Sequence, residues 1–268
     1  MPENGKKKFK KPPKKYQPKG LNFLYEDRDI LVVEKESGLL TVGTEKVRER
    51  SALYLLNNYI RKGDSKSRKE VYIVHRLDRD TSGVLIFAKT EQAQRHLQDE
   101  WANFQKLYYA VVLGVPEKKE DMITSYLTEN SAHRVYSTED SKKGKLAKTV
   151  YKVIKESPSA SLLEINLLTG RKNQIRVHLT ERGHPVLGDK KYSLKRNSPK
   201  QDQGKGEKKT NQTPPESKGS QSFGGSARRL ALHAASLTFT HPFSKEEMTF
   251  QTEIPPYFHS LLKGKPSS

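Results

Sequence analysis

The chain has 268 residues and carries 50 lysines and arginines against 31 acidic residues, a formal net charge of +19. Such a charge favours a polyanionic partner over a small neutral metabolite. The absence of cysteine excludes disulfides, thiolate metal sites and a cysteine nucleophile. Because the sequence has neither an apolar run of roughly 18 residues nor an apolar N-terminal signal, we expect a cytoplasmic protein without a membrane span.

The charge is unevenly distributed along the chain. Residues 1–20 hold eight lysines, one glutamate and almost no apolar side chains, which predicts a disordered basic tail. Residues 195–227 hold seven basic and three acidic residues and predict a second disordered segment. We therefore expect one folded domain over 21–262, interrupted by the polar insert 195–227, with a short tail at 263–268. The basic tail either attracts phosphates regardless of sequence or is only a solvated surface.

Apolar patterns predict the elements in chain order. Two short strands, at 21–25 and 29–34, precede a helix over 51–61. The apolar run 84–88 predicts a buried strand, and Thr90 then stands where a cap belongs before a helix over 91–103. The other expected elements are strands at 107–115, 147–154, 161–168, 230–239 and 248–253, and a helix over 172–181 closed by Gly183. Because strands outnumber helices and often follow one another directly, we predict an α+β fold with a mixed, largely antiparallel central sheet flanked by helices.

The densest group of polar residues is the segment HRLDRDTSG at 75–83, immediately before the apolar strand. Asp78 has Arg76 and Arg79 as neighbours in sequence, and opposite charges favour the ionised carboxylate. An ionised carboxylate on a loop that feeds a rigid strand can act as a nucleophile. The alternative is an ion-paired loop that ends in an ordinary turn.

A second polar group, TGRKNQIRVHL at 169–179, is typical of a turn that opens a helix. Arg176 shares a helix face with Ile175 and Leu179, so its cation faces a largely apolar surface. Such a cation either has an anionic partner or covers the core with its aliphatic stem.

Other chemistries lack the residues that they need. The sequence has no phosphate-loop motif of the form G-x-x-x-x-G-K-[ST] and no H-E-x-x-H motif. The eight histidines show no metal-ligand spacing, so we expect no metal and no nucleotide cofactor.

Six segments of the chain, in this order, resemble the RluA group of pseudouridine synthases. They are HRLD with TSG at 75–83, KLYYA at 106–110, AKTVY at 147–151, TGRKNQIRVHL at 169–179, GHPVLGD at 183–189 and LALHA at 230–234. The resemblance covers roughly residues 21–193 and 228–259. One departure is that Lys35-Glu36-Ser37-Gly38 stands where the family commonly has Lys-Pro-x-Gly.

The resemblance implies isomerisation of uridine to pseudouridine in ribosomal (23S-type) or transfer RNA, without metal, nucleotide or redox cofactor. Separately, we expect a monomer. It implies that Asp78 is the nucleophile, that Tyr108 lies against the base, and that Arg176 pairs with the catalytic carboxylate. It also implies that the target uridine is flipped out and that Arg76 fills the vacated space. Further substrate contacts are expected from His75, Thr81, Arg171 and Gln174.

Two alternatives have different signatures. A basic RNA-binding or ribosome-associated protein would use the same surface without chemistry, but it would not need a carboxylate set among cations. A carboxylate-based nuclease would need an acidic cluster to hold magnesium, which the sequence lacks.

Overall fold

The computed structural model describes residues 11–64, 66–193 and 229–263, and the expected insert at 195–227 lies outside them. The strands are β1 (Leu21–Glu26), β2 (Ile30–Lys35), β3 (Tyr72–Ile73), β4 (Ser82–Ala88), β5 (Gln105–Leu113), β6 (Glu120–Glu129), β7 (Val135–Thr138), β8 (Lys145–Ser157), β9 (Ala160–Leu167), β10 (Leu232–Thr240) and β11 (Glu247–Gln251). The helices are α1 (Ala52–Arg61), α2 (Glu91–Asp99), α3 (Gln174–Glu181) and α4 (Pro256–Leu262), with short 3-10 helices η1 (Lys14–Tyr16), η2 (Glu45–Arg50) and η3 (Glu100–Asn103).

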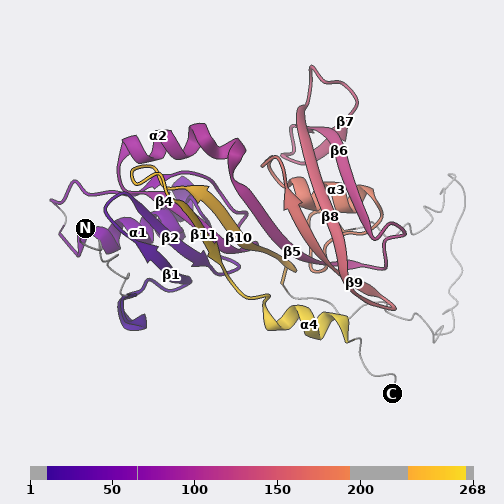
Figure 1. The fold of residues 1–268 in the computed structure, drawn as a ribbon, viewed down its shortest axis with the longest axis horizontal. Helices are drawn as coiled ribbons and strands as arrows, with labels where there is room; N and C mark the ends of the chain where they lie inside the picture. The colour runs from indigo at the N-terminus through magenta and orange to yellow at the C-terminus, as the bar shows by residue number, and fades with distance from the viewer. Residues whose placement is uncertain (1–10, 65, 194–228, 264–268) are drawn as a thin grey trace, which may run out of the picture.

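All eleven strands belong to one sheet, ordered β1-β2-β4-β10-β5-β9-β8-β6-β7, with β11 paired to β10 and β3 to β4 (Figure 1). Among these named strands, β10 and β4 are the one parallel pair, and the other pairs are antiparallel. The mixed, largely antiparallel sheet of an α+β fold is therefore confirmed. Strand β5 runs from the half that contains β4 to the half that contains β9, so it joins the two halves of the sheet.

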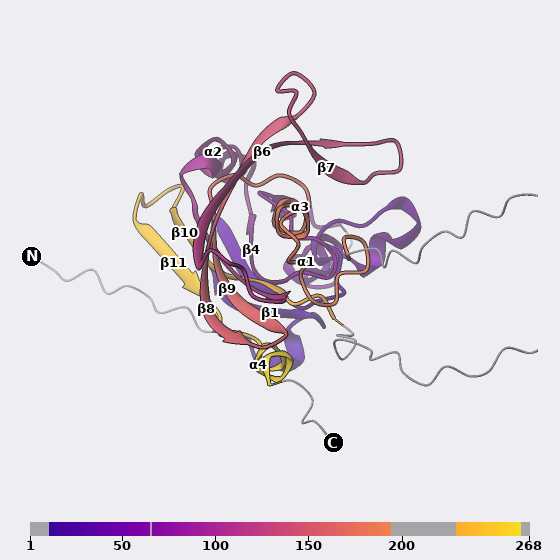
Figure 2. The ribbon, with the colours of Figure 1, turned by 90° about the vertical axis from the view of Figure 1, so that its right-hand side faces the viewer.

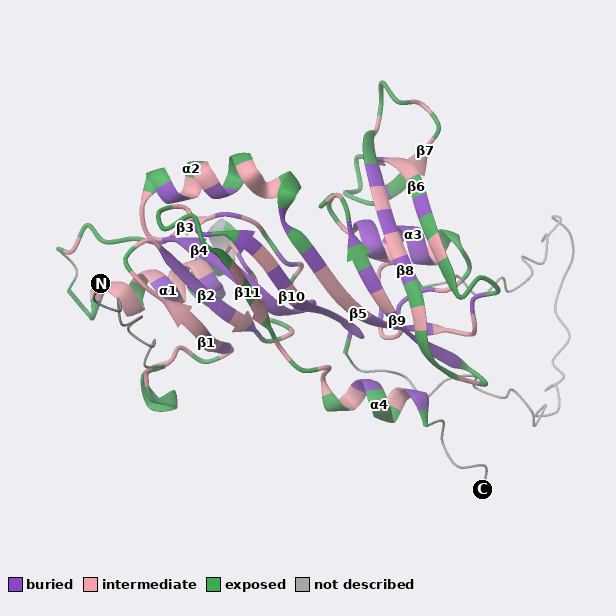
Figure 3. Cartoon of the chain, in the orientation of Figure 1, coloured by how far each residue is buried: buried purple, intermediate pink, exposed green. Residues whose placement is uncertain are grey.

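Helices cover both faces of the first half of the sheet. On β2, Leu31 and Val33 belong to the apolar cluster of α1, whereas Ile30 and Val32 belong to the cluster of α2. Every residue of β4 is buried for the same reason (Figure 3). Burial on both faces explains why these two strands are continuous apolar runs in the sequence rather than alternating ones.

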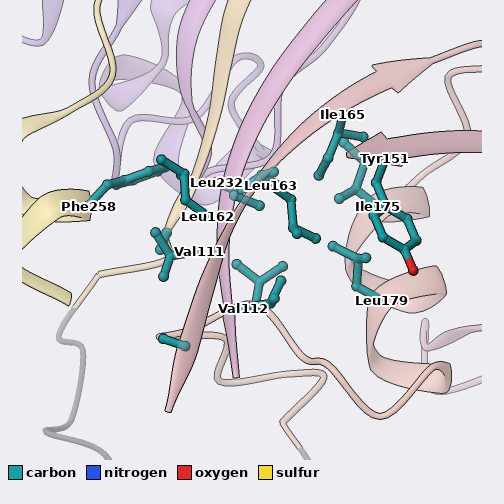
Figure 4. Close-up of a cluster of buried hydrophobic side chains, with 14 of the residues drawn as sticks. Val111, Val112, Tyr151, Leu162, Leu163, Ile165, Ile175, Leu179, Leu232 and Phe258 are labelled. Atoms are coloured by element: carbon teal, nitrogen blue, oxygen red, sulfur yellow. The ribbon is translucent and has the colours of Figure 1, made fainter. Parts of the chain in front are cut away.

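The second half of the sheet buries mainly one face. Strand β8 alternates between buried and accessible residues over positions 147–151 (Figure 3), and α3 lies against one side of this half (Figure 2). Ile175 and Leu179 of α3 pack with Tyr151 and Ile165, and Phe258 of α4 joins the same cluster (Figure 4). The apolar face of α3 therefore fixes the helix that carries Arg176.

The helix starts agree with the capping chemistry in two places. The hydroxyl oxygen of Thr90 accepts a hydrogen bond from the backbone N–H of Ala93 at 3.1 Å, as expected for the cap of α2. The Ser51 hydroxyl accepts one from Tyr54 N–H at 3.4 Å at the start of α1. None of the helices in the described residues is long and apolar enough to span a membrane.

Several expected boundaries are wrong. The helix predicted over 91–103 ends at Asp99 and continues as η3, and the helix predicted from 172 begins at Gln174 because Asn173 is left-handed, with φ 54°. Local order also begins before Leu21, since Gln17 in the expected tail accepts a hydrogen bond from Phe23 N–H at 3.0 Å. Residues 1–10 of that tail lie outside the described chain. Among the strands and α-helices of the described residues, β3, β6, β7 and α4 were not expected from the sequence, and neither were the 3-10 helices η1 and η2.

Candidate active site

A pocket of about 510 Å³ lies where the β3–β4 loop, the end of α2, β5 and the β9–α3 turn meet. It is lined by residues that the sequence singled out on separate segments: His75, Arg76, Asp78, Thr81, Tyr108, Arg171, Gln174 and Arg176. Gln98 and Trp101 of the α2–η3 segment complete one wall. All eight predicted site residues therefore line a single pocket.

The loop that carries Asp78 is held by hydrogen bonds to its backbone. The buried ammonium of Lys35 donates to the carbonyl oxygens of Glu36, Leu39 and Arg79 at 3.0, 2.8 and 3.0 Å. The Thr41 hydroxyl donates to the Leu77 carbonyl at 2.8 Å. Burial lowers the pKa of Lys35 to about 8, against the opposing charges of Asp80 and Asp78.

A close backbone approach sets the end of this loop. Gly83 has φ +119° and pairs with Ala234 in the parallel ladder between β4 and β10. A Cβ atom at Gly83 would lie 2.1 Å from the Ala234 carbonyl oxygen. Glycine is therefore required where the chain leaves the Asp78 loop and enters β4.

Arg176 joins two carboxylates. Its Nη1 donates to Asp78 Oδ2 at 2.9 Å, while its Nε and Nη2 donate to the two oxygens of Asp189 at 2.7 and 2.9 Å. The Asn173 side chain accepts from the same guanidinium at 3.0 Å, and the ring of Tyr192 lies 5.0 Å from it. The anionic partner expected for Arg176 is therefore present twice.

The charges of this group stabilise one another. Burial opposes the charged guanidinium, but the hydrogen bonds and charges of Asp189 and Asp78 outweigh it and raise the pKa of Arg176. Burial likewise opposes the ionised form of Asp189, yet its bonds to Arg176 and to two backbone N–H groups lower its pKa. Arg176 and Asp189 are consequently ionised at neutral pH. The side chain of Asp189 is fully buried, whereas that of Asp78 is 32% exposed.

Asp78 keeps one carboxylate oxygen free. Arg176 holds Oδ2, and within the described residues no donor pairs with Oδ1. The backbone carbonyl of Asp78 accepts from Thr81 N–H at 3.2 Å, which closes a tight turn over residues 78–81. The side chain is therefore fixed at one oxygen and open at the other.

Tyr108 on β5 lines the pocket beside Asp78. Burial, with the charge of Asp78 adding to it, raises the pKa of its phenol well above the usual value. Its hydroxyl forms no hydrogen bond within the described parts of the chain. Tyr108 therefore presents a neutral O–H group to the pocket.

Of the other predicted residues, two are arginines at the pocket and one is a stacked histidine. Arg76 is exposed and has no ion-pair partner among the described residues, and Arg171 donates through Nε to the Leu146 carbonyl at 3.0 Å. His75 stacks on Trp101 with ring centroids 4.5 Å apart, and burial, aided by the charge of Lys106, lowers its pKa to about 3. His75 is therefore neutral at physiological pH.

Gln174 differs from the sequence expectation. Its Oε1 accepts from the Thr169 hydroxyl at 2.8 Å and from Arg171 N–H at 3.0 Å. Its Nε2 donates to the Lys148 carbonyl at 3.0 Å and to the Thr149 hydroxyl at 2.9 Å. All four hydrogen-bonding positions of this buried amide are used within the protein, so Gln174 fits a positioning role for the turn rather than a contact with substrate.

Sequence reasoning did not select Lys35, Trp101 or Asp189 as site residues. Asp189 is the last residue of the GHPVLGD segment. A carboxylate at the end of an apolar segment that contains glycine could have identified it as a site residue. Trp101 is the single tryptophan of the chain, but its place in the pocket depends on contacts across the sheet.

Residues that suit a metal lie elsewhere. Asp27, Asp29 and His241 form the single histidine–carboxylate group of the described chain with the spacing for an ion, and none of the three lines the pocket. Asp27 Oδ1 already accepts from the backbone N–H groups of Asp29 and Ile30, and its Oδ2 bonds to His241 at 2.9 Å. The group therefore has an internal structural role.

Comparison with known proteins gives one consistent result. The family model described as RNA pseudouridylate synthase matches residues 29–181. The ribosomal large subunit pseudouridine synthase C of Vibrio vulnificus is 32% identical over 230 residues, which cover 84% of this chain and 63% of that protein. The dual-specificity RNA pseudouridine synthase RluA of Vibrio cholerae is 32% identical over 227 residues, covering 84% of this chain and 79% of that protein. A solved structure, human RNA pseudouridylate synthase domain containing 4, matches with a TM-score of 0.65 and 25% identity, over 90% of this chain and 91% of that one.

Proposed function

Because this chain belongs to the RluA-type family of RNA pseudouridine synthases, and is thus an enzyme that isomerises uridine to pseudouridine, we propose that Asp78 is its nucleophile. We further propose that its substrates are specific uridines of ribosomal or transfer RNA. The observation that carries the first proposal is the Asp78 carboxylate itself, with Oδ2 bonded to Arg176 and Oδ1 free in the pocket. The names of the two Vibrio relatives support the second.

The proposed reaction starts at the ribose of a bound uridine. Asp78 attacks C1′, a C1′–O bond forms, and the C1′–N1 bond breaks with its electron pair passing to the uracil. The detached uracil turns within the pocket, and its C5 attacks C1′ to release the aspartate. The proton on C5 is lost and N1 gains one, so the product has the same atoms as the substrate. These steps consume no oxidant and no second substrate.

Arg176 is proposed as the group that aims Asp78. Its bidentate pair with buried Asp189 fixes the guanidinium, which then holds one oxygen of the nucleophile. Because the arginine carries two carboxylate partners, its charge remains balanced when Asp78 becomes an ester. Tyr108 is proposed to lie against the base and to take part in proton transfer as a neutral phenol.

A uridine within structured RNA must leave its stack to reach this pocket. Extrusion costs about a few kcal/mol, which contacts in the pocket and to the phosphates offset. Arg76 is exposed at the pocket and uncommitted to any partner in the described chain, so we propose that it occupies the space of the extruded base. Arg171 and Thr81 are proposed as substrate contacts, and His75 as a neutral wall of the pocket.

The test is pseudouridine mapping by carbodiimide labelling and primer extension on ribosomal and transfer RNA. Cells that lack the gene are compared with cells rescued by the wild type or by Asp78→Asn. We expect a discrete site to disappear in the deletion strain and to return with the wild type alone, because the amide keeps the shape of the aspartate but not its nucleophilicity. The RNA that contains the site names the substrate.

Two outcomes would contradict the proposals. A site restored by Asp78→Asn would remove Asp78 as nucleophile. No lost site in either RNA would exclude both substrate classes and favour an RNA-binding protein without this chemistry. Thermal unfolding of Asp78→Asn, expected to match the wild type closely, separates a chemical effect from a folding defect.

A further inference from the structure

The lining of the pocket contains Trp101, which the proposed mechanism does not use. Its ring stacks on His75 at 4.5 Å between centroids, and the Lys106 ammonium lies 5.0 Å from its centroid. Lys106 is buried and also donates to the Trp101 carbonyl at 3.0 Å. These contacts fix the plane of the indole, so its N–H group points in a defined direction.

That N–H group is free. No hydrogen-bond acceptor pairs with Trp101 Nε1 anywhere in residues 11–64, 66–193 and 229–263, although Trp101 lines the pocket. The buried side-chain nitrogen and oxygen atoms of the described chain all have partners, so an unpaired Nε1 is one that solvent or a ligand reaches.

Gly170 leaves this edge of the indole uncovered. The exposed glycine opens the turn before α3, and a Cβ atom there would lie 3.2 Å from Trp101 Nε1. Gly170 and its neighbour Arg171 line the same pocket as Trp101. A fixed donor and a bare backbone thus lie side by side in the lining of the pocket that contains Asp78.

An indole N–H is a donor only, so its ligand must offer an acceptor. RNA offers acceptor oxygens on its base carbonyls and its phosphates. We propose that Trp101 is a substrate-contacting residue, whose Nε1–H donates a hydrogen bond to an acceptor oxygen of the RNA nucleotide bound in the pocket. This inference rests on the proposed function and adds a recognition contact to it.

The single tryptophan makes the contact directly measurable. Binding of fluorescein-labelled hexauridylate is followed by anisotropy, and tryptophan emission is recorded separately with the unlabelled probe. An abasic ribose-phosphate hexamer is the second probe, since it has the phosphates without the bases. We expect emission to change as the probe binds. A change with hexauridylate alone assigns the contact to a uracil carbonyl, and an equal change with both probes assigns it to phosphate.

Two variants test the N–H group in different ways. Trp101→Phe keeps a ring to stack on His75 but removes the donor, and we expect it to weaken hexauridylate binding about fivefold, as for one hydrogen bond. Gly170→Ala retains the tryptophan but places a methyl group against Nε1, and should weaken binding similarly while reducing the emission change. Circular dichroism and thermal unfolding check that each variant folds.

Bound hexauridylate with unchanged emission, or a Trp101→Phe variant that binds as tightly as the wild type, would overturn the inference. These readouts do not require turnover. If RNA mapping finds no pseudouridine site while the emission of Trp101 changes on binding, the proposed function fails and the RNA contact stands.

Discussion

The Asp78 side and the Arg176 side of the pocket are held by different kinds of contact. On the first side, Lys35 and Thr41 donate to backbone carbonyls, and Gly83 allows backbone to touch backbone. On the second side, the contacts of Arg176 are with the side chains of Asp189 and Asn173. The nucleophile is therefore placed by the path of the main chain, and the arginine by a network of side chains.

This difference predicts which positions tolerate change. A lysine that donates to carbonyl oxygens does not depend on the side chains of the residues that carry those oxygens, so the side chain at position 36 is free to vary. A guanidinium that is bidentate to a carboxylate depends on that carboxylate. Substitutions on the first side should act through backbone geometry, and those on the second through charge and hydrogen bonding.

The largest expected effect is at Gly83. The added methyl group of Gly83→Ala would overlap the Ala234 carbonyl, 2.1 Å from the ideal Cβ position. We expect the free energy of unfolding to fall by about 4 kcal/mol or more, measured by urea denaturation. Gly63→Ala is the control, because Gly63 also has positive φ, +80°, but nothing lies within 4 Å of its Cβ position. Equal losses in the two variants would show that backbone strain, and not the close approach, matters at Gly83.

Asp189→Asn should have the next largest effect. Asp189 now accepts hydrogen bonds from Arg176 and from the backbone N–H groups of Lys191 and Tyr192. The NH₂ group of an asparagine would place a donor against one of these donors. Breaking such a buried pair costs about 3 kcal/mol, and the pseudouridine-forming rate should fall because Arg176 loses its anchor. Glu129→Gln is the control, since Glu129 pairs with exposed Lys172 and His133. Its unfolding curve should stay close to that of the wild type, and an equal shift would contradict the assignment.

Lys35→Met tests the loop of the nucleophile. Without the ammonium, three carbonyl oxygens around the loop lose their shared donor, and Asp78 is no longer aimed. A small misplacement of a reacting group lowers the rate about 100-fold, so kcat should fall while KM changes little. Lys89→Met is the control, because this half-buried lysine also donates to a backbone carbonyl, that of Asp27, but does not line the pocket. If kcat falls equally in both variants, the loss does not come from displacement of the loop that carries Asp78.

The smallest effect is a pH dependence to which one histidine on each side contributes. Burial lowers the pKa of His178 on α3 to about 4, with the charge of Arg182 adding to it, and burial alone lowers that of His233 on β10 to about 4. In the unfolded chain a histidine has a pKa of about 6.5 and takes up a proton below that pH. In the folded protein both histidines stay neutral until the pH is much lower. Stability is therefore complete above about pH 6.5 and declines as the pH falls towards about 4.

Each histidine should contribute about 2 kcal/mol of this loss between pH 7 and pH 5. Urea unfolding at both pH values measures it. His178→Gln and His233→Gln should each reduce the difference between the two pH values by a similar amount. A variant that retains the full pH dependence would exclude its histidine as the source.

The sequence predicts the first half of the sheet better than the second for a physical reason. Strands β2 and β4 are buried on both faces and become apolar runs that are easily recognised. On β6, Ile123 and Leu127 are buried, but Ser125 between them lies on the same face and bonds to His178 at 3.0 Å. That inward serine interrupts the alternation, so β6 was not predicted.

The sequence also predicts the residues of the site better than the contacts between them. The motifs identify Asp78 and Arg176, but their contact spans 98 residues of sequence and depends on how the sheet brings β4 and α3 together. The bond from Lys35 to the Arg79 carbonyl spans 44 residues, and no local pattern predicts it. The family resemblance implies a substrate contact for Gln174, but four hydrogen bonds within the protein occupy its buried amide.

The position of β10 has a consequence for synthesis of the chain. In the sheet this strand lies between β4 and β5. In the sequence it is far from both, because β5 ends at Leu113 and β10 begins only at Leu232. A nascent chain that has not yet reached β10 therefore exposes unpaired edges of two central strands, which are prone to pair with other chains. Closure of the sheet must wait for a distant segment, a topology typical of slow folding. We therefore expect fragments that stop before Leu232 to aggregate.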